Sequence, residues 1–188
     1  MTHTLGALTI ILLLGMVLAR VAILRRRGIV TTKFGAIDKT DFLIPPFAFF
    51  YFYLIFASAL HWPTVVRSML FTSTVLAWTG VALCACGLGA MVATLIAFGS
   101  SFRIGIDMDS PDKLVTTGVF AASRNPVYVA FVMVLAGEFL ILPHWLLLLY
   151  LLAGAMLFHR QVLREEAFLA SHYGSEYELY RKRVHRYL

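Results

Sequence analysis

The polar residues of this sequence that could do chemistry concentrate in two segments, residues 100–128 and 159–188. In the first, Arg124 directly precedes Asn125-Pro126. Proline is favoured at the first position of a helix, where its missing N–H is harmless. We therefore expect Arg124 to stand at a helix N-terminus, where free backbone N–H groups and the guanidinium together favour an anion. The structural alternative is an arginine that only reaches toward lipid headgroups.

The second segment carries an acidic pair, Glu165-Glu166, on the predicted continuation of an apolar helix. Two carboxylates at this place can hold an ammonium group or ribose hydroxyls. The structural alternative is salt bridging to Arg160 or Arg181. We expect this helix to end at Gly174, because glycine is common just past a helix C-terminus.

A short helix is predicted beyond that point, with Ser175 and Glu178 as a capping box. Tyr177, Tyr180 and Val184 fall at positions i, i+3 and i+7, so they form one apolar stripe. Four cations occupy much of the remaining surface, which predicts a helix lying along the membrane surface: Arg181, Lys182, Arg183 and Arg186.

The composition excludes an ordinary soluble domain. Of the 188 residues, 60% are hydrophobic and 14% are charged, whereas soluble domains have about 45–50% and about 25%. Two cysteines exclude a disulfide scaffold, and we expect Cys84 and Cys86 to be small core or lipid-facing residues. The histidines show no ligand spacing, so no metal is predicted; His61 and His144 are expected at the membrane interface. Glu138 is expected in mid-span, either functional or hydrogen-bonded in a structural role.

Apolar runs predict an all-α polytopic membrane protein with about five transmembrane helices: residues 5–24, 42–60, 68–98, 127–142 and 145–158. The third run would be about 46 Å long as a helix, so we expect it to be tilted. The last two runs predict a helical hairpin whose second arm continues into the polar tail. Small residues favour close packing of the third helix: Gly80, Ala82, Gly87 and Ala90.

The distribution of cations predicts the orientation. Residues 25–41, 99–126 and 159–188 hold 14 lysines and arginines, while the segments on the other side hold only Arg67. By the positive-inside rule the N-terminus lies outside, and the polar segments and C-terminus lie on the cytoplasmic face. The net charge of +6 therefore reflects topology and attraction to membrane lipids. Nucleic acid is not an expected partner, because the cations are spread over three segments.

An ordered set of short motifs runs through residues 112–186: Leu114-Val115-Thr116-Thr117-Gly118-Val119-Phe120, Arg124-Asn125-Pro126-Val127-Tyr128, Glu165-Glu166, Tyr173-Gly174-Ser175-Glu176-Tyr177-Glu178-Leu179-Tyr180 and Val184-His185-Arg186. This set resembles the isoprenylcysteine carboxyl methyltransferase and phospholipid N-methyltransferase superfamily of integral membrane methyltransferases. The first three spans carry no shared motif. Residues 1–98 would thus form transmembrane helices 1–3, and residues 99–188 the cofactor-binding catalytic region.

The resemblance implies S-adenosylmethionine (S-adenosyl-L-methionine) as methyl donor and a lipophilic small-molecule or lipid acceptor that enters from the bilayer. Carboxylate, amine, thiol and hydroxyl acceptors are all compatible with the sequence. The sequence also leaves the oligomeric state open. The cofactor residues carried over from the family are Val115, Gly118 and Phe120 along its approach, Arg124, Asn125 and Tyr128 as its wall, Glu165 on a polar group, and Tyr177 and Tyr180 as a lid. Arg124 is the implied catalytic residue, with Arg164 or Glu166 orienting the acceptor.

Two positions depart from the family pattern. Asn125 stands where histidine is usual, and His185 stands where proline is common. Asparagine forms hydrogen bonds but is not a cation near neutral pH, so a positioning role survives this change and an acid–base role does not. Two alternatives stay open. One is an NADPH-dependent membrane reductase related to sterol reductases, which generally have more spans; the other is a non-catalytic lipid-binding membrane protein, which Asn125 favours.

Overall fold

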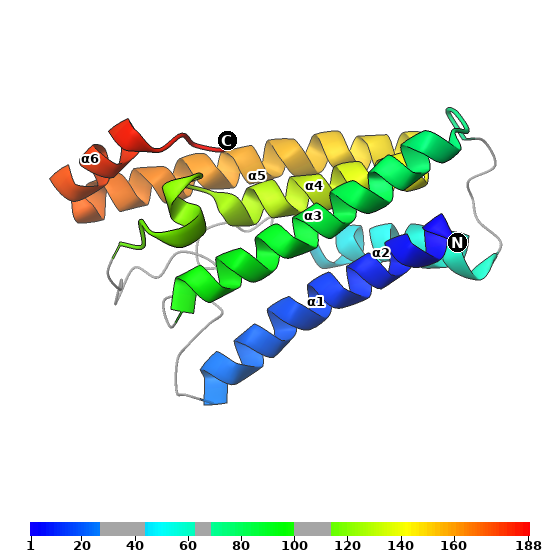
Figure 1. Cartoon of the computed structure of the whole chain (residues 1–188), viewed down its shortest axis with the longest axis horizontal. Helices are drawn as coiled ribbons and strands as arrows, with labels where there is room; N and C mark the ends of the chain where they lie inside the picture. The colour runs from blue at the N-terminus through cyan, green and yellow to red at the C-terminus, as the bar shows by residue number, and fades with distance from the viewer. Residues whose placement is uncertain (27–43, 63–68, 100–113) are drawn as a thin grey trace.

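The computed structural model describes residues 1–26, 44–62, 69–99 and 114–188, and in these residues every regular element is helical (Figure 1). The predicted all-α class is therefore confirmed. The elements are α1 (Thr2–Arg26), α2 (Ile44–Leu60), α3 (Thr74–Phe98), the 3-10 helix η3 (Gly118–Ala121), α4 (Pro126–Ile141), α5 (Trp145–Tyr173) and α6 (Ser175–Arg183).

Five apolar helices coincide with the five predicted runs. Of the described helices, α1, α3 and α5 are long and apolar enough to cross a membrane, whereas α2 and α4 are shorter apolar helices. The third run forms one helix as expected, but it begins at Thr74, because the Ser73 hydroxyl accepts a hydrogen bond from the Leu76 N–H at 3.3 Å. The Leu70 N–H instead donates to the Pro143 carbonyl in the α4–α5 turn, at 2.7 Å.

Helix α5 continues without a break past residue 158 and ends at Gly174, as predicted. Gly174 adopts a φ of +53°, a conformation that glycine reaches without strain. The predicted capping box is wrong. Gly174 already occupies the N-cap position of α6 and Ser175 is its first helical residue, so no side chain caps this end. Glu178 forms an ion pair with Arg181 at 3.4 Å instead.

Helices α3 and α4 form the closest contact in the bundle because glycines line it. A Cβ atom added to Gly80 would lie 2.5 Å from the Gly137 carbonyl oxygen, and one added to Gly87 would lie 3.0 Å from that of Ala130. The prediction of close packing is confirmed at Gly80 and Gly87 and is wrong for Ala82, which is exposed. Of the cysteines, Cys84 is buried and Cys86 is exposed, in agreement with the expected roles.

Two polar residues of the α4–α5 region are buried. Glu138 lies in the last turn of α4, and its Oε1 is 4.0 Å from the Cys84 sulfur. His144 lies in the turn before α5 with 1% exposure. Its Nδ1 accepts a hydrogen bond from the Leu146 N–H at 3.1 Å and so caps α5. The sequence does not reveal this capping role, because it does not show which ring of the adjacent His144 and Trp145 is buried.

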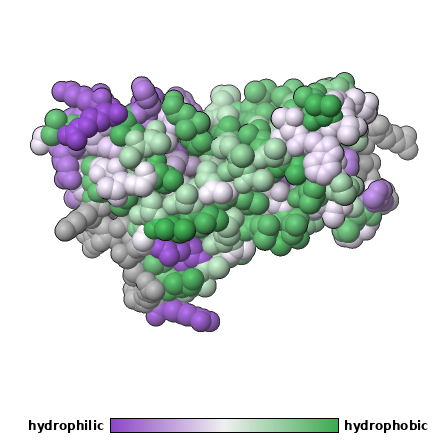
Figure 2. Space-filling model, viewed as in Figure 1, coloured by the Kyte–Doolittle hydropathy of each residue, from purple (hydrophilic) through white to green (hydrophobic). Residues whose placement is uncertain are grey.

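The long helices run along one axis of the molecule (Figure 1). The C-terminal ends of α1, α3 and α5, the start of α4, η3 and α6 all lie at one end, and the N-terminus lies toward the other. We call the first end, formed by residues 114–126 and 159–188, the polar end. Figure 2 shows hydrophobic residues over the middle of the bundle and a concentration of hydrophilic residues over α6. The described polar segments that were predicted to share one side therefore do so.

Candidate functional site

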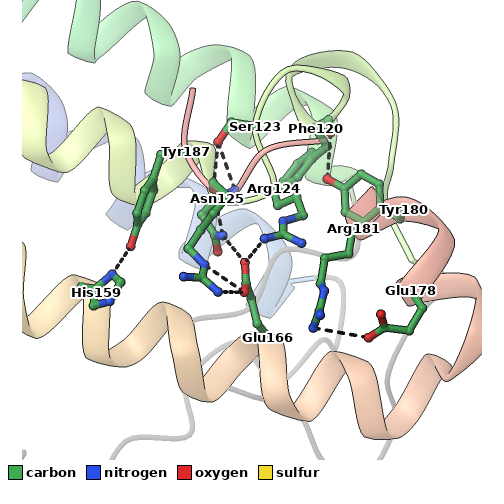
Figure 3. Close-up of polar contacts among 11 residues, drawn as sticks. Phe120, Ser123, Arg124, Asn125, His159, Glu166, Glu178, Tyr180, Arg181 and Tyr187 are labelled. Carbon is green, nitrogen blue, oxygen red and sulfur yellow. Dashed lines mark hydrogen bonds and ion pairs between the residues drawn. The ribbon is translucent and has the colours of Figure 1, made fainter. Parts of the chain in front are cut away.

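A buried carboxylate, Glu166, is the centre of the polar end (Figure 3). It projects from α5 with only 8% of its side chain exposed. Its Oε1 lies 3.1 Å from Nη2 of Arg124 and accepts a hydrogen bond from Nδ2 of Asn125, also at 3.1 Å. Its Oε2 lies 3.0 Å and 2.9 Å from Nε and Nη2 of Arg186. All three partners are donors, so Glu166 is fully engaged by groups of the protein itself.

The start of α4 places Arg124 and Asn125 against Glu166. Pro126 is the first helical residue and Asn125 is the N-cap, as the sequence predicts. The Asn125 N–H donates to Oγ of Ser123 at 3.1 Å, which fixes the turn. The Asn125 side chain does not cap the helix; Nδ2 donates to Glu166 and, at 3.1 Å, to the Arg186 carbonyl. This asparagine therefore links α4, α5 and the C-terminal tail.

The tail that follows α6 folds back over this cluster. The Arg124 N–H donates to the His185 carbonyl at 3.0 Å, and the Ser123 hydroxyl donates to the Arg186 carbonyl at 3.4 Å. The Tyr187 hydroxyl lies 2.7 Å from Nδ1 of His159 on α5. Hydrogen bonding to Glu166 raises the pKa of Arg186, which therefore stays a cation.

The cluster has an excess of positive charge and of unused donors. Two guanidinium groups face one carboxylate. Within the described residues, Nε and Nη1 of Arg124 and the hydroxyl of Tyr177 are buried without a hydrogen-bond partner. Buried donors are normally satisfied, and leaving one unpaired costs about 1–3 kcal/mol. Three such donors next to a surplus positive charge fit an anion such as a carboxylate.

Glu165, the neighbouring carboxylate, is held by other residues than Glu166. Its Oε1 accepts hydrogen bonds from the Tyr128 hydroxyl at 2.5 Å and from Nε2 of Gln161 at 3.1 Å. Tyr128 also contacts Phe158 with ring centroids 5.7 Å apart, and Phe158 stacks on Phe131 at 5.4 Å. Glu165 thus lies where the polar end meets an aromatic part of the α4–α5 contact.

Two tyrosines attach α6 to the site. Tyr177 is completely buried, and Tyr180 donates a hydrogen bond to the Phe120 carbonyl of η3 at 2.7 Å. Phe120 in turn packs on Phe98 at the end of α3, with ring centroids 4.7 Å apart. Burial raises the pKa of both tyrosines to about 12. Both hydroxyls therefore remain neutral donors at physiological pH.

All the predicted site residues except Tyr128 lie in the segments that form the polar end, and Tyr128 reaches Glu165 from the first turn of α4. Arg164 precedes Glu166 by two residues, so it projects from nearly the opposite side of α5 to Glu166. Val115 is half-buried before η3, and Gly118 begins η3 with a φ of +64°. Arg160 and Arg181 are the predicted alternative salt-bridge partners of the acidic pair. Glu166 pairs with Arg124 and Arg186 instead, and Arg181 pairs with Glu178.

Residue-level reasoning missed three participants: Ser123, Gln161 and Arg186. Gln161 lies one helical turn before Glu165, and this i, i+4 spacing is a signal that was available. Arg186 belongs to the Val184-His185-Arg186 motif, but the sequence places it on the surface of the helix predicted after Gly174, since a return of the tail to α5 has no periodic signature. Ser123 gives no signal beyond its place in a turn.

Comparison with known proteins agrees with the resemblance of the motifs. The profile of the phospholipid methyltransferase family matches residues 75–176. A protein-S-isoprenylcysteine O-methyltransferase of Schizosaccharomyces pombe is 33% identical over 95 residues, which cover 49% of this chain and 40% of that protein. One from Tribolium castaneum is 32% identical over 111 residues, covering 56% of this chain and 40% of its own length. The aligned regions thus span less than half of these relatives. The family profile covers more than half of this chain, which belongs to the phospholipid methyltransferase family.

Proposed function

We propose that this protein is an S-adenosylmethionine-dependent membrane methyltransferase that acts on a lipophilic acceptor held in the bilayer. The observation that carries the proposal is the set of buried donors on Arg124 and Tyr177 that find no partner among the described residues, beside the Glu166 cluster. A family of methyltransferases needs a site for a zwitterionic, charged donor. The polar end supplies complementary groups directly beside the apolar bundle.

The residues present fit the donor group by group. The open nitrogens of Arg124 and the Tyr177 hydroxyl suit its carboxylate, and the Glu165 carboxylate suits its ammonium group or ribose hydroxyls. Aromatic faces such as those of Tyr128 and Tyr180 suit a sulfonium cation. Val115, Gly118 and Phe120 would line the approach, and Asn125 would hold the wall of the site. When bound, the donor supplies a methyl group activated by the positive sulfur.

The protein's own contribution is positioning and exclusion of water. Displacement at a methyl group needs alignment of the two reactants in a dry site. Glu166 is saturated by Arg124, Asn125 and Arg186, so we assign it the orientation of Arg124 rather than direct contact with the acceptor. We assign no contact with the acceptor to Arg164, because it projects from nearly the opposite side of α5 to Glu166.

We further propose a carboxylate on a prenylated cysteine as the acceptor. Two relatives are named for isoprenylcysteine O-methylation. The aromatic contact of Tyr128, Phe131 and Phe158 next to Glu165 offers an apolar surface to a prenyl chain at the edge of the polar end. The donor would come from the cytoplasm, in line with the cation distribution, and the acceptor from the bilayer.

Binding of S-adenosylhomocysteine to the purified protein in detergent tests the donor site. Calorimetric titration should show binding that weakens at least tenfold in Arg124→Ala and in Glu165→Ala, because each change removes a group assigned to the donor. Lys182→Ala, on the exposed side of α6, is the matched control and should bind as the parent does. Folded protein without any affinity for this compound, or one protected from thermal unfolding by NADPH instead, would refute the proposal.

The acceptor is tested with labelled donor and S-farnesylcysteine derivatives. A derivative with a free carboxylate should take up label that base hydrolysis releases, because the product is a methyl ester. The same derivative with its carboxylate already esterified is the control and should take up none. Label that enters an amine of a membrane lipid extract instead would keep the methyltransferase and reject the carboxylate acceptor.

A further inference from the structure

The tail after α6 does more than cover the cluster, because it divides the two oxygens of Glu166 between two arginines. Oε1 serves Arg124 and Asn125, while Oε2 serves Arg186 through two nitrogens. Two backbone carbonyls hold the chain in place at Arg186. Its own carbonyl accepts from Asn125, and the adjacent His185 carbonyl accepts from the Arg124 N–H.

The division has a consequence for Arg124. A guanidinium and a carboxylate left to themselves in a shielded place favour a bidentate pair with two parallel hydrogen bonds. Here Arg124 meets Glu166 through Nη2 and one oxygen only, and its buried Nε and Nη1 have no hydrogen-bond partner in the part of the chain that the structure describes. The second oxygen of Glu166 is not available to it, because Arg186 occupies that oxygen at 2.9 Å and 3.0 Å.

We propose that Arg186 is a positioning residue for the donor site: by holding Oε2 of Glu166, it prevents Glu166 from closing on Arg124 and keeps two Arg124 donors open for the donor's carboxylate. This inference rests on the proposed function. Without Arg186, Glu166 turns both oxygens to Arg124, the pair becomes neutral, and one of the two open Arg124 nitrogens is consumed. Arg186 acts through Glu166 and does not itself need to touch the donor.

The test compares two ligands that differ in the carboxylate. S-adenosylhomocysteine carries it, and 5′-methylthioadenosine lacks the whole amino acid portion. In Arg186→Ala, the calorimetric Kd for S-adenosylhomocysteine should rise at least tenfold, whereas that for 5′-methylthioadenosine should stay within twofold of the parent value. Arg186→Lys should recover part of the loss, since one ammonium group can still hold Oε2. Arg183→Ala is the charge-matched control on the exposed side of α6 and should bind both ligands as the parent does.

A second background separates positioning from simple attraction of an anion. In Glu166→Gln the competing carboxylate is absent, so adding Arg186→Ala should change the Kd for S-adenosylhomocysteine less than threefold. Equal losses for both ligands in Arg186→Ala, parent-like binding in that variant, or an undiminished effect in the Glu166→Gln background would each overturn the inference. If the parent protein itself binds neither ligand, the proposed function fails, which is a different result from parent binding that Arg186→Ala leaves unchanged.

Discussion

Replacing Asn125 by aspartate tests how the cluster is held together with the smallest possible change in shape. The Asn125 side chain is nearly isosteric with aspartate and is buried, with 7% exposure. Its Nδ2 donates to Oε1 of Glu166 and to the Arg186 carbonyl, each at 3.1 Å. In Asn125→Asp, an oxygen replaces this donor, so two hydrogen bonds become two contacts between acceptors. One of these contacts brings the introduced carboxylate next to the carboxylate of Glu166.

The size of the effect follows from these contacts. The hydrogen bond to the carboxylate contributes about 1.5–3 kcal/mol and the one to the carbonyl about 1 kcal/mol. Repulsion between two carboxylates at about 3 Å adds several kcal/mol at an effective dielectric constant of about 20, and Arg124 and Arg186 offset part of it. We expect a net loss of about 3–5 kcal/mol, which lowers the melting temperature by roughly 10 °C for a chain of this size. Asn125→Ala removes only the two hydrogen bonds and should cost about 2.5–4 kcal/mol.

Thermal unfolding in one detergent, followed by intrinsic fluorescence, measures the three proteins side by side at pH 8 and pH 5. The order of stability at pH 8 should be parent, Asn125→Ala, Asn125→Asp. The gap between the parent and Asn125→Asp should narrow at pH 5, because protonation of the introduced carboxyl removes a charge and restores one donor. An aspartate variant as stable as the parent at pH 8, or a gap that widens in acid, would refute the hydrogen-bond assignment of Asn125.

The remaining predictions concern packing and the two buried tyrosines. Gly80→Ala should cost about 1–3 kcal/mol, because its Cβ meets the backbone of α4 at 2.5 Å, whereas Gly89→Ala on the same helix meets nothing within 4 Å and should be neutral or stabilising by up to about 1 kcal/mol; chemical unfolding of both variants checks this. Tyr180→Phe should lower stability by about 1–3 kcal/mol, since it leaves the buried Phe120 carbonyl unpaired. Tyr177→Phe removes a buried hydroxyl that has no partner among the described residues, so it should leave the melting temperature unchanged or higher while weakening S-adenosylhomocysteine binding in calorimetry.

The sequence predicts the helices well because their signals are local. Apolar length marks each span, and proline and glycine mark the beginning of α4 and the end of α5. The small residues of α3 also identify the α4 contact, since Gly80 and Gly87 follow one another at seven residues and so lie on one face. This reasoning fails at two helix ends, where local capping decides the boundary. The Ser73 hydroxyl caps α3 and so shortens it, and Gly174 occupies the N-cap position that the sequence predicts for Ser175.

The polar end is predictable in its members but not in its pairing. Arg124 and Glu166 are both expected there, and each has several potential partners in the sequence. The choice among these partners depends on the return of the tail over the start of α4, a contact between residues about 60 positions apart. No periodicity encodes such a contact. For the same reason the sequence places Arg186 on a surface helix, while the structure places it on a buried carboxylate.

The departure at position 125 also bears on the chemistry. A neutral histidine has one N–H donor on its ring, whereas Asn125 uses two N–H groups at once, on Glu166 and on the Arg186 carbonyl. Asparagine therefore links the tail to α5 through one more hydrogen bond than a neutral histidine could. It cannot, however, take up a proton from the methyl acceptor. A carboxylate acceptor is already ionised at neutral pH and needs no base, whereas a protonated amine must first lose a proton. The residue that fixes the site thus favours the proposed carboxylate acceptor over an amine, and it predicts a methylation rate that stays nearly constant between pH 6.5 and 8.5. A rate that rises tenfold per pH unit over this range would instead indicate a deprotonation step that Asn125 cannot assist.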